Sequence, residues 1–238
     1  MTALTAAAAA AAAFISFVVS ASAGLGGSLV LVPALSLLLG AKEGVALAAL
    51  LLAANNVFKV VAYRSTMPVR LSVGIVAATI VGAFIGARLL IAAPERVVGV
   101  AVVVAMAATF LLERRRLRRA LRMSGPVLAL GSGLTSGFSG TSGPLKGVAV
   151  RGLGLDRLHM VGAASMVSLA GDATKTAVFA EASLLGSGAV AFAAAAMPLM
   201  FLGTWAGRRL NQSLGEKAFA GLFWGVMAGY SIRLALAW

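Results

Sequence analysis

The chain has 238 residues, of which 61% are hydrophobic and 11% are charged, whereas a soluble domain carries about 25% charged residues. This composition excludes a water-soluble globular fold and indicates a membrane protein with several spans. The formal net charge is +13, and a chain with no cysteine and one histidine cannot form disulfides, thiolate or multi-histidine metal sites, or a cysteine nucleophile.

The apolar runs predict ten helical segments, five in each half of the chain. They are 4–22, 25–40, 44–62, 69–91 and 95–112, then 125–138, 143–152, 158–180, 186–207 and 217–237. A full crossing takes about 20 residues, and most segments beside two Gly/Ser-rich breaks are shorter. We therefore expect each break to be the tip of a re-entrant-like hairpin that lines a cavity. Ordinary tight turns at one membrane surface are the alternative.

The first segment ends in Ala21-Ser22-Ala23, which fits the small-residue rule for cleavage of a signal peptide. However, no Lys or Arg precedes the apolar run, and the residues that follow resemble an internal stretch of the second half. We therefore expect the first segment to remain in the protein as a membrane helix.

Three polar patterns occur once in each half, in the same order: a Gly/Ser-rich break, a lysine inside an apolar run, and Gly-x-x-x-Gly-x-Arg-Leu. The pairs are 22–28 with 136–143, Lys59 with Lys175, and 82–89 with 203–210. The offsets are 113 residues from Gly24 to Gly137, 116 from Lys59 to Lys175 and 121 from Gly82 to Gly203, which is what a duplication with small insertions produces. Duplicated halves with broken helices and buried polar groups are typical of secondary transporters.

The loop between the halves carries six arginines between Glu113 and Arg122, which predicts a cytoplasmic position. Nucleic-acid binding is the weaker alternative for such a run. With five segments per half, 13 of the 20 Lys and Arg residues fall on the inner side and four on the outer side. An odd number of segments makes the halves antiparallel.

The predicted fold is an all-α polytopic membrane protein with two inverted repeats, each a broken hairpin plus three transmembrane helices. The predicted parts are 1–112, a basic linker at 113–124, and 125–238.

The two Gly/Ser breaks are candidate binding sites for a small anion. Helix N-termini offer unpaired N–H groups and a partial positive charge, glycine lets an anion approach the backbone, and hydroxyl groups add donors. The candidate residues are Gly24, Gly26, Gly27, Ser28, Ser139, Gly140, Thr141, Ser142 and Gly143.

Polar side chains inside the apolar runs form a second group of candidates, because a charge in the bilayer usually faces a cavity or a partner. As alternatives, Lys59 could extend to the inner surface, and Lys175 could form a structural ion pair with Asp172 one turn earlier. A carboxyl group removed from water also takes up a proton more readily. The candidates are Asn55, Asn56, Lys59, Lys146 and Lys175 as anion ligands, and Asp172 as a proton carrier.

Small residues predict close helix packing at the Gly-x-x-x-Gly pairs of both halves. Gly221, Gly225 and Gly229 form a longer stripe without a counterpart in the first half. This stripe is a candidate homodimer face, and packing within one chain is the alternative.

The run from Ser22 to Ser36, SAGLGGSLVLVPALS, resembles the first signature of the sulfite exporter TauE/SafE family, in which a Gly-rich turn leads into an apolar helix with a Pro-Ala-Leu step. Gly137 to Pro144 and the repeated Gly-x-x-x-Gly-x-Arg-Leu are similar to its repeat pattern, so the resemblance covers nearly the whole chain. Ser142 departs from the pattern, because a further glycine is expected there. The resemblance implies a plasma-membrane permease for sulfite, sulfoacetate or other organosulfonates.

These observations predict a secondary transporter that moves a small sulfur-containing anion across a bacterial-type inner membrane by alternating access. Its partners would be the anion and the lipid bilayer, with no nucleic acid, metal or other cofactor. An anion channel and a structural membrane subunit are the alternatives. An enzyme is disfavoured by the single histidine, the absence of cysteine and the presence of only seven carboxylates, most of them in loops.

Overall fold

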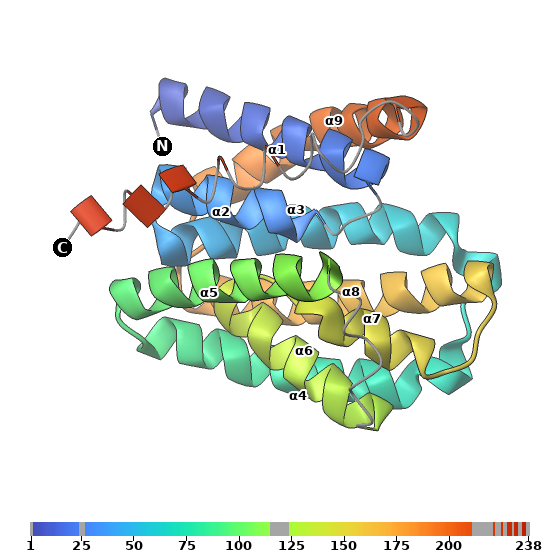
Figure 1. Ribbon diagram of the computed structural model, residues 1–238. Helices are drawn as coiled ribbons and strands as arrows, with labels where there is room; N and C mark the ends of the chain where they lie inside the picture. The colour runs from blue at the N-terminus through green and yellow to red at the C-terminus, as the bar shows by residue number, and fades with distance from the viewer. Residues whose placement is uncertain are drawn as a thin grey trace.

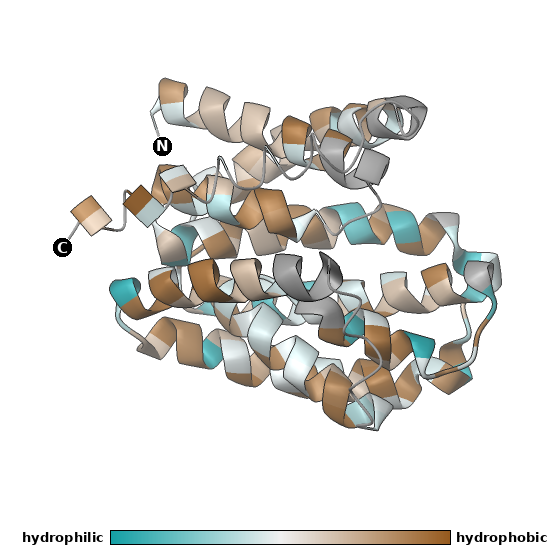
Figure 2. Cartoon of the chain, in the orientation of Figure 1, coloured by the Kyte–Doolittle hydropathy of each residue, from teal (hydrophilic) through white to brown (hydrophobic). Residues whose placement is uncertain are grey.

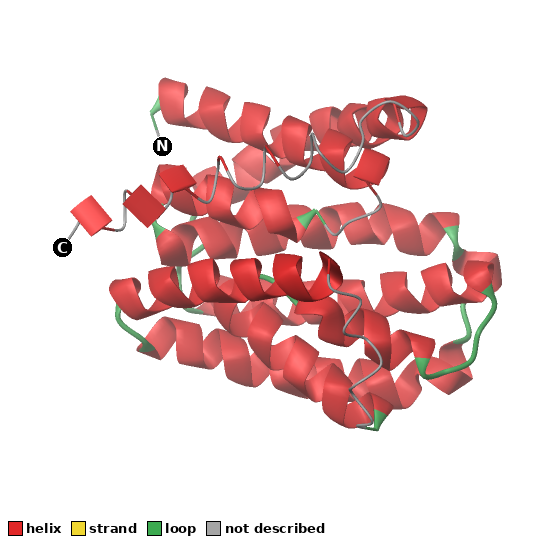
Figure 3. Cartoon of the chain, viewed as in Figure 1, coloured by secondary structure: helices red, strands yellow, loops and turns green. Residues whose placement is uncertain are grey.

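The computed structural model describes residues 2–23, 27–114 and 124–210, together with isolated positions beyond residue 220. Gly24, Gly26, most of the basic linker and more than half of the last expected segment lie outside these residues. The described part consists of helices and loops and contains no strand (Figure 3). The prediction of an all-α fold is confirmed for this part of the chain.

The helices follow the predicted segments, and every predicted boundary that falls in the described part lies within three residues of the observed one. They are α1 (Ala3–Ala23), α2 (Ser28–Leu39), α3 (Ala41–Ala62), the short 3₁₀ helix η1 (Arg64–Thr66), α4 (Val69–Ala92), α5 (Glu95–Arg114), α6 (Gly125–Ser139), α7 (Gly143–Arg151), α8 (Arg157–Glu181) and α9 (Ser187–Leu210). Figure 1 shows them running roughly parallel and antiparallel to one another in a single bundle.

Among the described residues, three stretches are long and apolar enough to cross a membrane: Ala41–Val61, Val69–Ala92 and Ser187–Ala206. By contrast, the 12 residues of α2 and the 9 residues of α7 extend for only about 18 and 14 Å, against a hydrocarbon core of about 30 Å. Large apolar side chains such as Val73 and Phe201 are exposed, and apolar residues are frequent along the outer helices in Figure 2. This surface suits contact with lipid tails.

The two hairpins meet inside the bundle. Residues 29 to 36 of α2 are all buried, so this short helix lies in the protein core. The second hairpin turns at Gly140, whose φ of +78° is a left-handed conformation that glycine adopts without steric cost. A Cβ at this position would lie 2.8 Å from a methyl group of Val32 in α2. The tip of the second hairpin therefore contacts the first hairpin directly.

Helices of the first half pack against helices of the second half, which we call crosswise packing. Helix α4 packs against α6, and α9 packs against α1. At the first contact the backbones nearly touch, since a Cβ on Gly82 would lie 2.1 Å from the Leu130 carbonyl oxygen and one on Gly86 would lie 2.2 Å from that of Leu134. At the second contact, a Cβ on Gly203 would lie 2.9 Å from the Phe14 carbonyl oxygen. The prediction that these repeated glycines allow close packing is confirmed for Gly82, Gly86 and Gly203, and the surroundings of Gly207 are outside what the structure describes.

Contacts between loops and helix ends hold each end of the bundle together. The Glu95 carboxylate accepts a hydrogen bond from the Ala41 amide and so joins the loop after α2 to the loop after α4. Near the same end, Arg88 and Glu181 form an exposed ion pair of 2.8 Å. At the opposite end, η1 contacts α8.

Candidate functional site

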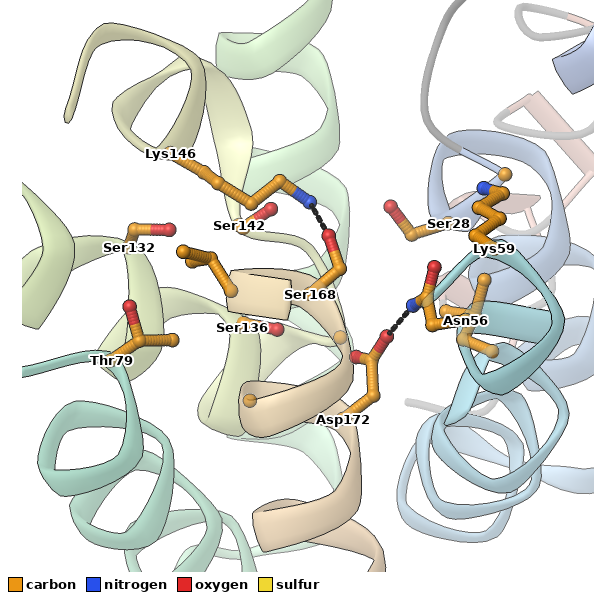
Figure 4. A pocket seen from close by; sticks show the side chains of 15 residues that line it. Ser28, Asn56, Lys59, Thr79, Ser132, Ser136, Ser142, Lys146, Ser168 and Asp172 are labelled. Atoms are coloured by element: carbon orange, nitrogen blue, oxygen red, sulfur yellow. Dashed lines mark hydrogen bonds between the residues drawn. The ribbon is translucent and has the colours of Figure 1, made fainter. Parts of the chain in front are cut away.

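A cavity lies between the two hairpin tips and the middle of the bundle, and it contains about 520 Å³ not filled by protein atoms, part of it open to the surroundings. The lining residues are Gly27, Ser28, Leu52, Asn56, Lys59, Thr79, Ser132, Ser136, Gly140, Ser142, Lys146, Val167, Ser168, Gly171 and Asp172. Figure 4 shows the polar members of this set converging from helices of both halves. A polar cavity in so apolar a bundle is the natural candidate for a ligand site.

Two helix N-termini border the cavity. Helix α2 starts at Ser28 after Gly27, and α7 starts after Ser142; neither preceding residue provides a side-chain cap. The first N–H groups of a helix have no partner within that helix. These helix ends therefore place backbone N–H groups and a partial positive charge at the cavity edge. Both Gly/Ser breaks contribute to one cavity, as the cavity interpretation expected.

A buried polar network connects α3, α6 and α8 beside the cavity. The Asn56 side-chain amide donates to Asp172 Oδ2 at 2.6 Å, and Lys175 Nζ lies 2.8 Å from Asp172 Oδ1. Lys175 also donates to Ser136 Oγ at 2.9 Å. The Lys175 side chain is 1% exposed and that of Asp172 is 11% exposed, so water screens this ion pair little. The predicted ion pair between these two residues exists.

The network joins two residues that the sequence patterns would place at matching positions of the predicted repeats. Asn56 and Asp172 are 116 residues apart, the same offset that separates Lys59 from Lys175. The two lysines nevertheless differ in their surroundings. Lys59 lines the cavity, whereas Lys175 lies behind the lining and contacts it through Asp172 and Ser136. Lys59 and Lys175 therefore have different surroundings, although the sequence patterns pair them.

A second lysine reaches the cavity from α7. Lys146 Nζ donates to Ser168 Oγ of α8 at 2.8 Å, as Figure 4 shows. This contact spans the two helices that follow the second hairpin tip. Within the residues described, no group of three or more His, Asp or Glu side chains is placed to hold a metal ion.

A family model described as "Sulfite exporter TauE/SafE" matches residues 8–234. The chain belongs to this family. A search of curated proteins and a search of solved structures each gave no match. Membership in the TauE/SafE family implies a membrane permease for sulfur-containing anions and a multi-pass membrane location.

The structure of this TauE/SafE-family protein brings most of the predicted site residues together. Those that line the cavity are Gly27, Ser28, Asn56, Lys59, Gly140, Ser142, Lys146 and Asp172. Those that do not line it are Asn55, Ser139, Thr141 and Lys175. The Ser139 hydroxyl donates instead to the Thr135 carbonyl oxygen at 2.8 Å. Gly24 and Gly26 lie outside the described residues, and Gly143 is described only as the first residue of α7.

Four hydroxyl residues of the lining were not among the candidates: Thr79, Ser132, Ser136 and Ser168. Ser132 Oγ is fully buried and has no hydrogen-bond partner in the described part of the chain. A helical spacing signal was present, because Ser132 and Ser136 are four residues apart and so share one face of α6. The same face of α6 leads to Gly140 at the tip of the second hairpin.

Proposed function

We propose that the protein is a secondary transporter that moves a small sulfur-containing anion, such as sulfite or an organosulfonate, through the cavity between the hairpin tips. The observation that carries this proposal is the convergence of two uncapped helix N-termini with Lys59 and Lys146 around one polar cavity. N–H groups, hydroxyl groups and ammonium groups are the donors that replace the water shell of an oxyanion. Family membership supports the same class of substrate.

The carboxylate in the lining does not oppose this role. Both oxygens of Asp172 already accept from protein groups, one from Asn56 and one from Lys175. Its negative charge is therefore compensated from behind the cavity wall. Under this proposal Asp172 is also the candidate for proton coupling, because protonation would release Lys175 from its partner.

Inverted repeats and alternating access are part of the proposal. The crosswise pairs of α4 with α6 and α9 with α1, and the contact between Asn56 and Asp172, are what a two-fold axis in the membrane plane would produce. The proposed repeats are 1–112 and 125–238, joined by the basic linker at 113–124. The cavity would lie at the interface of the repeats, where transporters of this design bind substrate.

Neutralising the cavity lysines is expected to weaken anion transport. We expect Lys59→Gln and Lys146→Gln each to raise the half-saturating sulfite concentration about tenfold or more, since a hydrogen bond to a charged group contributes about 1.5–3 kcal/mol. The measurement is uptake of labelled sulfite into proteoliposomes. Lys42→Gln is the matched control, because Lys42 donates to the Ile91 carbonyl oxygen at the end of the bundle. Wild-type uptake in both cavity variants would contradict the proposal.

The same proteoliposomes separate a transporter from a channel. A transporter that works by alternating access saturates with substrate and shows counterflow, so unlabelled sulfite inside the vesicles should accelerate entry of labelled sulfite. A channel shows flux that neither saturates in this range nor responds to counterflow. A structural subunit shows no flux at all.

A further inference from the structure

Two serines of the cavity wall are oriented by lysines. Lys175 Nζ donates to Ser136 Oγ at 2.9 Å, and Lys146 Nζ donates to Ser168 Oγ at 2.8 Å. An ammonium group can only donate, so each serine oxygen is the acceptor and each hydroxyl proton must point elsewhere. The positive charge beside the oxygen also makes each hydroxyl a stronger donor.

Serines in membrane helices commonly donate to the carbonyl oxygen four residues earlier. Here Ser16, Ser139 and Ser165 do so at 2.6 to 2.8 Å. Ser136 and Ser168 make no such bond in the described structure; each is engaged by its lysine and lines the cavity. Their hydroxyl protons therefore remain available to a ligand in that cavity.

A third serine points to the same conclusion independently. Ser132 lies one turn before Ser136 on α6 and is 0% exposed, and its hydroxyl has no hydrogen-bond partner among the described residues. It lines the cavity, and Figure 4 shows its hydroxyl directed inward among the labelled side chains. A buried hydroxyl without a protein partner requires a specific explanation. At the wall of a cavity, a bound molecule can complete the hydrogen bond.

We infer that Ser132, Ser136 and Ser168 hold the transported anion directly, and that Lys175 acts on it through Ser136. This inference rests on the proposed function. The ligand class is a small group with three acceptor oxygens on one atom, as in sulfite or a sulfonate, because three hydroxyl donors converge with the two helix N-termini. A carboxylate offers only two such oxygens, and chloride accepts without preferred directions, so both should bind more weakly.

Ser132→Ala gives the sharpest test, because it should change stability and binding in opposite directions. Removing an unpaired buried hydroxyl should raise the melting temperature of the ligand-free protein. Removing a ligand donor should weaken sulfite and methanesulfonate binding about tenfold, which corresponds to about 1.4 kcal/mol. Both quantities come from thermal-shift titrations of the purified full chain.

Ser72→Ala is the matched control. Ser72 is also 0% exposed, and its hydroxyl has no partner in the described part of the protein, but it does not line the cavity. Its replacement should raise the melting temperature without changing sulfite affinity. Equal sulfite affinity of Ser132→Ala and wild type would overturn the assignment of this serine.

Substitutions of Ser136 test whether Lys175 acts on the anion through this serine. Ser136→Ala should weaken sulfite binding about tenfold, and Ser136→Thr, which keeps a hydroxyl group, should restore most of it. Wild-type affinity in Ser136→Ala and Ser132→Ala together would overturn the inference but leave the proposed function standing. A wild-type protein that binds neither sulfite nor methanesulfonate would overturn the proposed function itself, and this inference with it.

Discussion

Replacing Gly82 with alanine is expected to destabilise the helix bundle by about 3 kcal/mol or more, at the upper end of the effect of overpacking. The new methyl group would start 2.1 Å from the Leu130 carbonyl oxygen, and backbone cannot rotate away as a side chain can. Helices α4 and α6 would have to separate along the contact that Gly82 shares with Gly133, whose own Cβ would lie 2.3 Å from the Thr79 carbonyl oxygen.

The control for this prediction lies on the same helix. Gly74 of α4 has nothing within 4 Å of an added Cβ, so Gly74→Ala should leave the melting temperature unchanged or raise it through better helix propensity. The measurement is thermal unfolding of both variants in detergent, followed by the loss of helical circular dichroism. Equal melting temperatures for the two variants would show that α4 and α6 do not pack backbone to backbone.

The buried ion pair between Asp172 and Lys175 should produce the second large effect. Removing one partner of a buried pair leaves the other charge uncompensated and costs about 3–5 kcal/mol, so Lys175→Met and Asp172→Asn should each be strongly destabilised. The double variant contains neither charge and should recover most of this loss, because the amide that replaces the Asp172 carboxylate can still accept from Asn56. Additive losses in the double variant would contradict a direct pair.

The double variant also separates a structural role from a functional one. If the pair only stabilised the fold, the restored protein would bind sulfite like wild type. We expect instead that its sulfite affinity stays low, because Ser136 loses the lysine that orients its hydroxyl. The measurement is sulfite binding by the folded double variant, with wild type and Ser72→Ala for comparison.

The helices were predictable because apolar runs in this chain end at clear signals. Pro68 precedes α4, Pro94 precedes α5, and the breaks before Ser28 and after Ser139 are rich in glycine and serine. Their partners were harder to predict. The glycines of α4 indicated a close contact, but nothing in their spacing identified α6 as the helix that receives them.

The site was predictable where a charge or a broken helix drew attention to it. Lys59, Lys146 and Asp172 were found because a charge inside an apolar run requires an explanation. Ser132 and Ser168 were missed because a serine in a membrane helix usually bonds to its own backbone, as Ser165 does. Only the positions of Lys146 and the cavity distinguish Ser168 from Ser165, and both are properties of the folded chain.

Crosswise packing has a consequence for biosynthesis. Domains generally fold as units, with the N-terminal part first, at about 5–20 residues per second. Here the glycine face of α4 receives its partner only when α6 has been made, and α1 receives α9 later still. The first half therefore stays in the bilayer for several seconds with its closest helix contacts unfilled. Neither half is a finished folding unit when it leaves the ribosome, and the protein can complete its core only after most of the chain has been inserted.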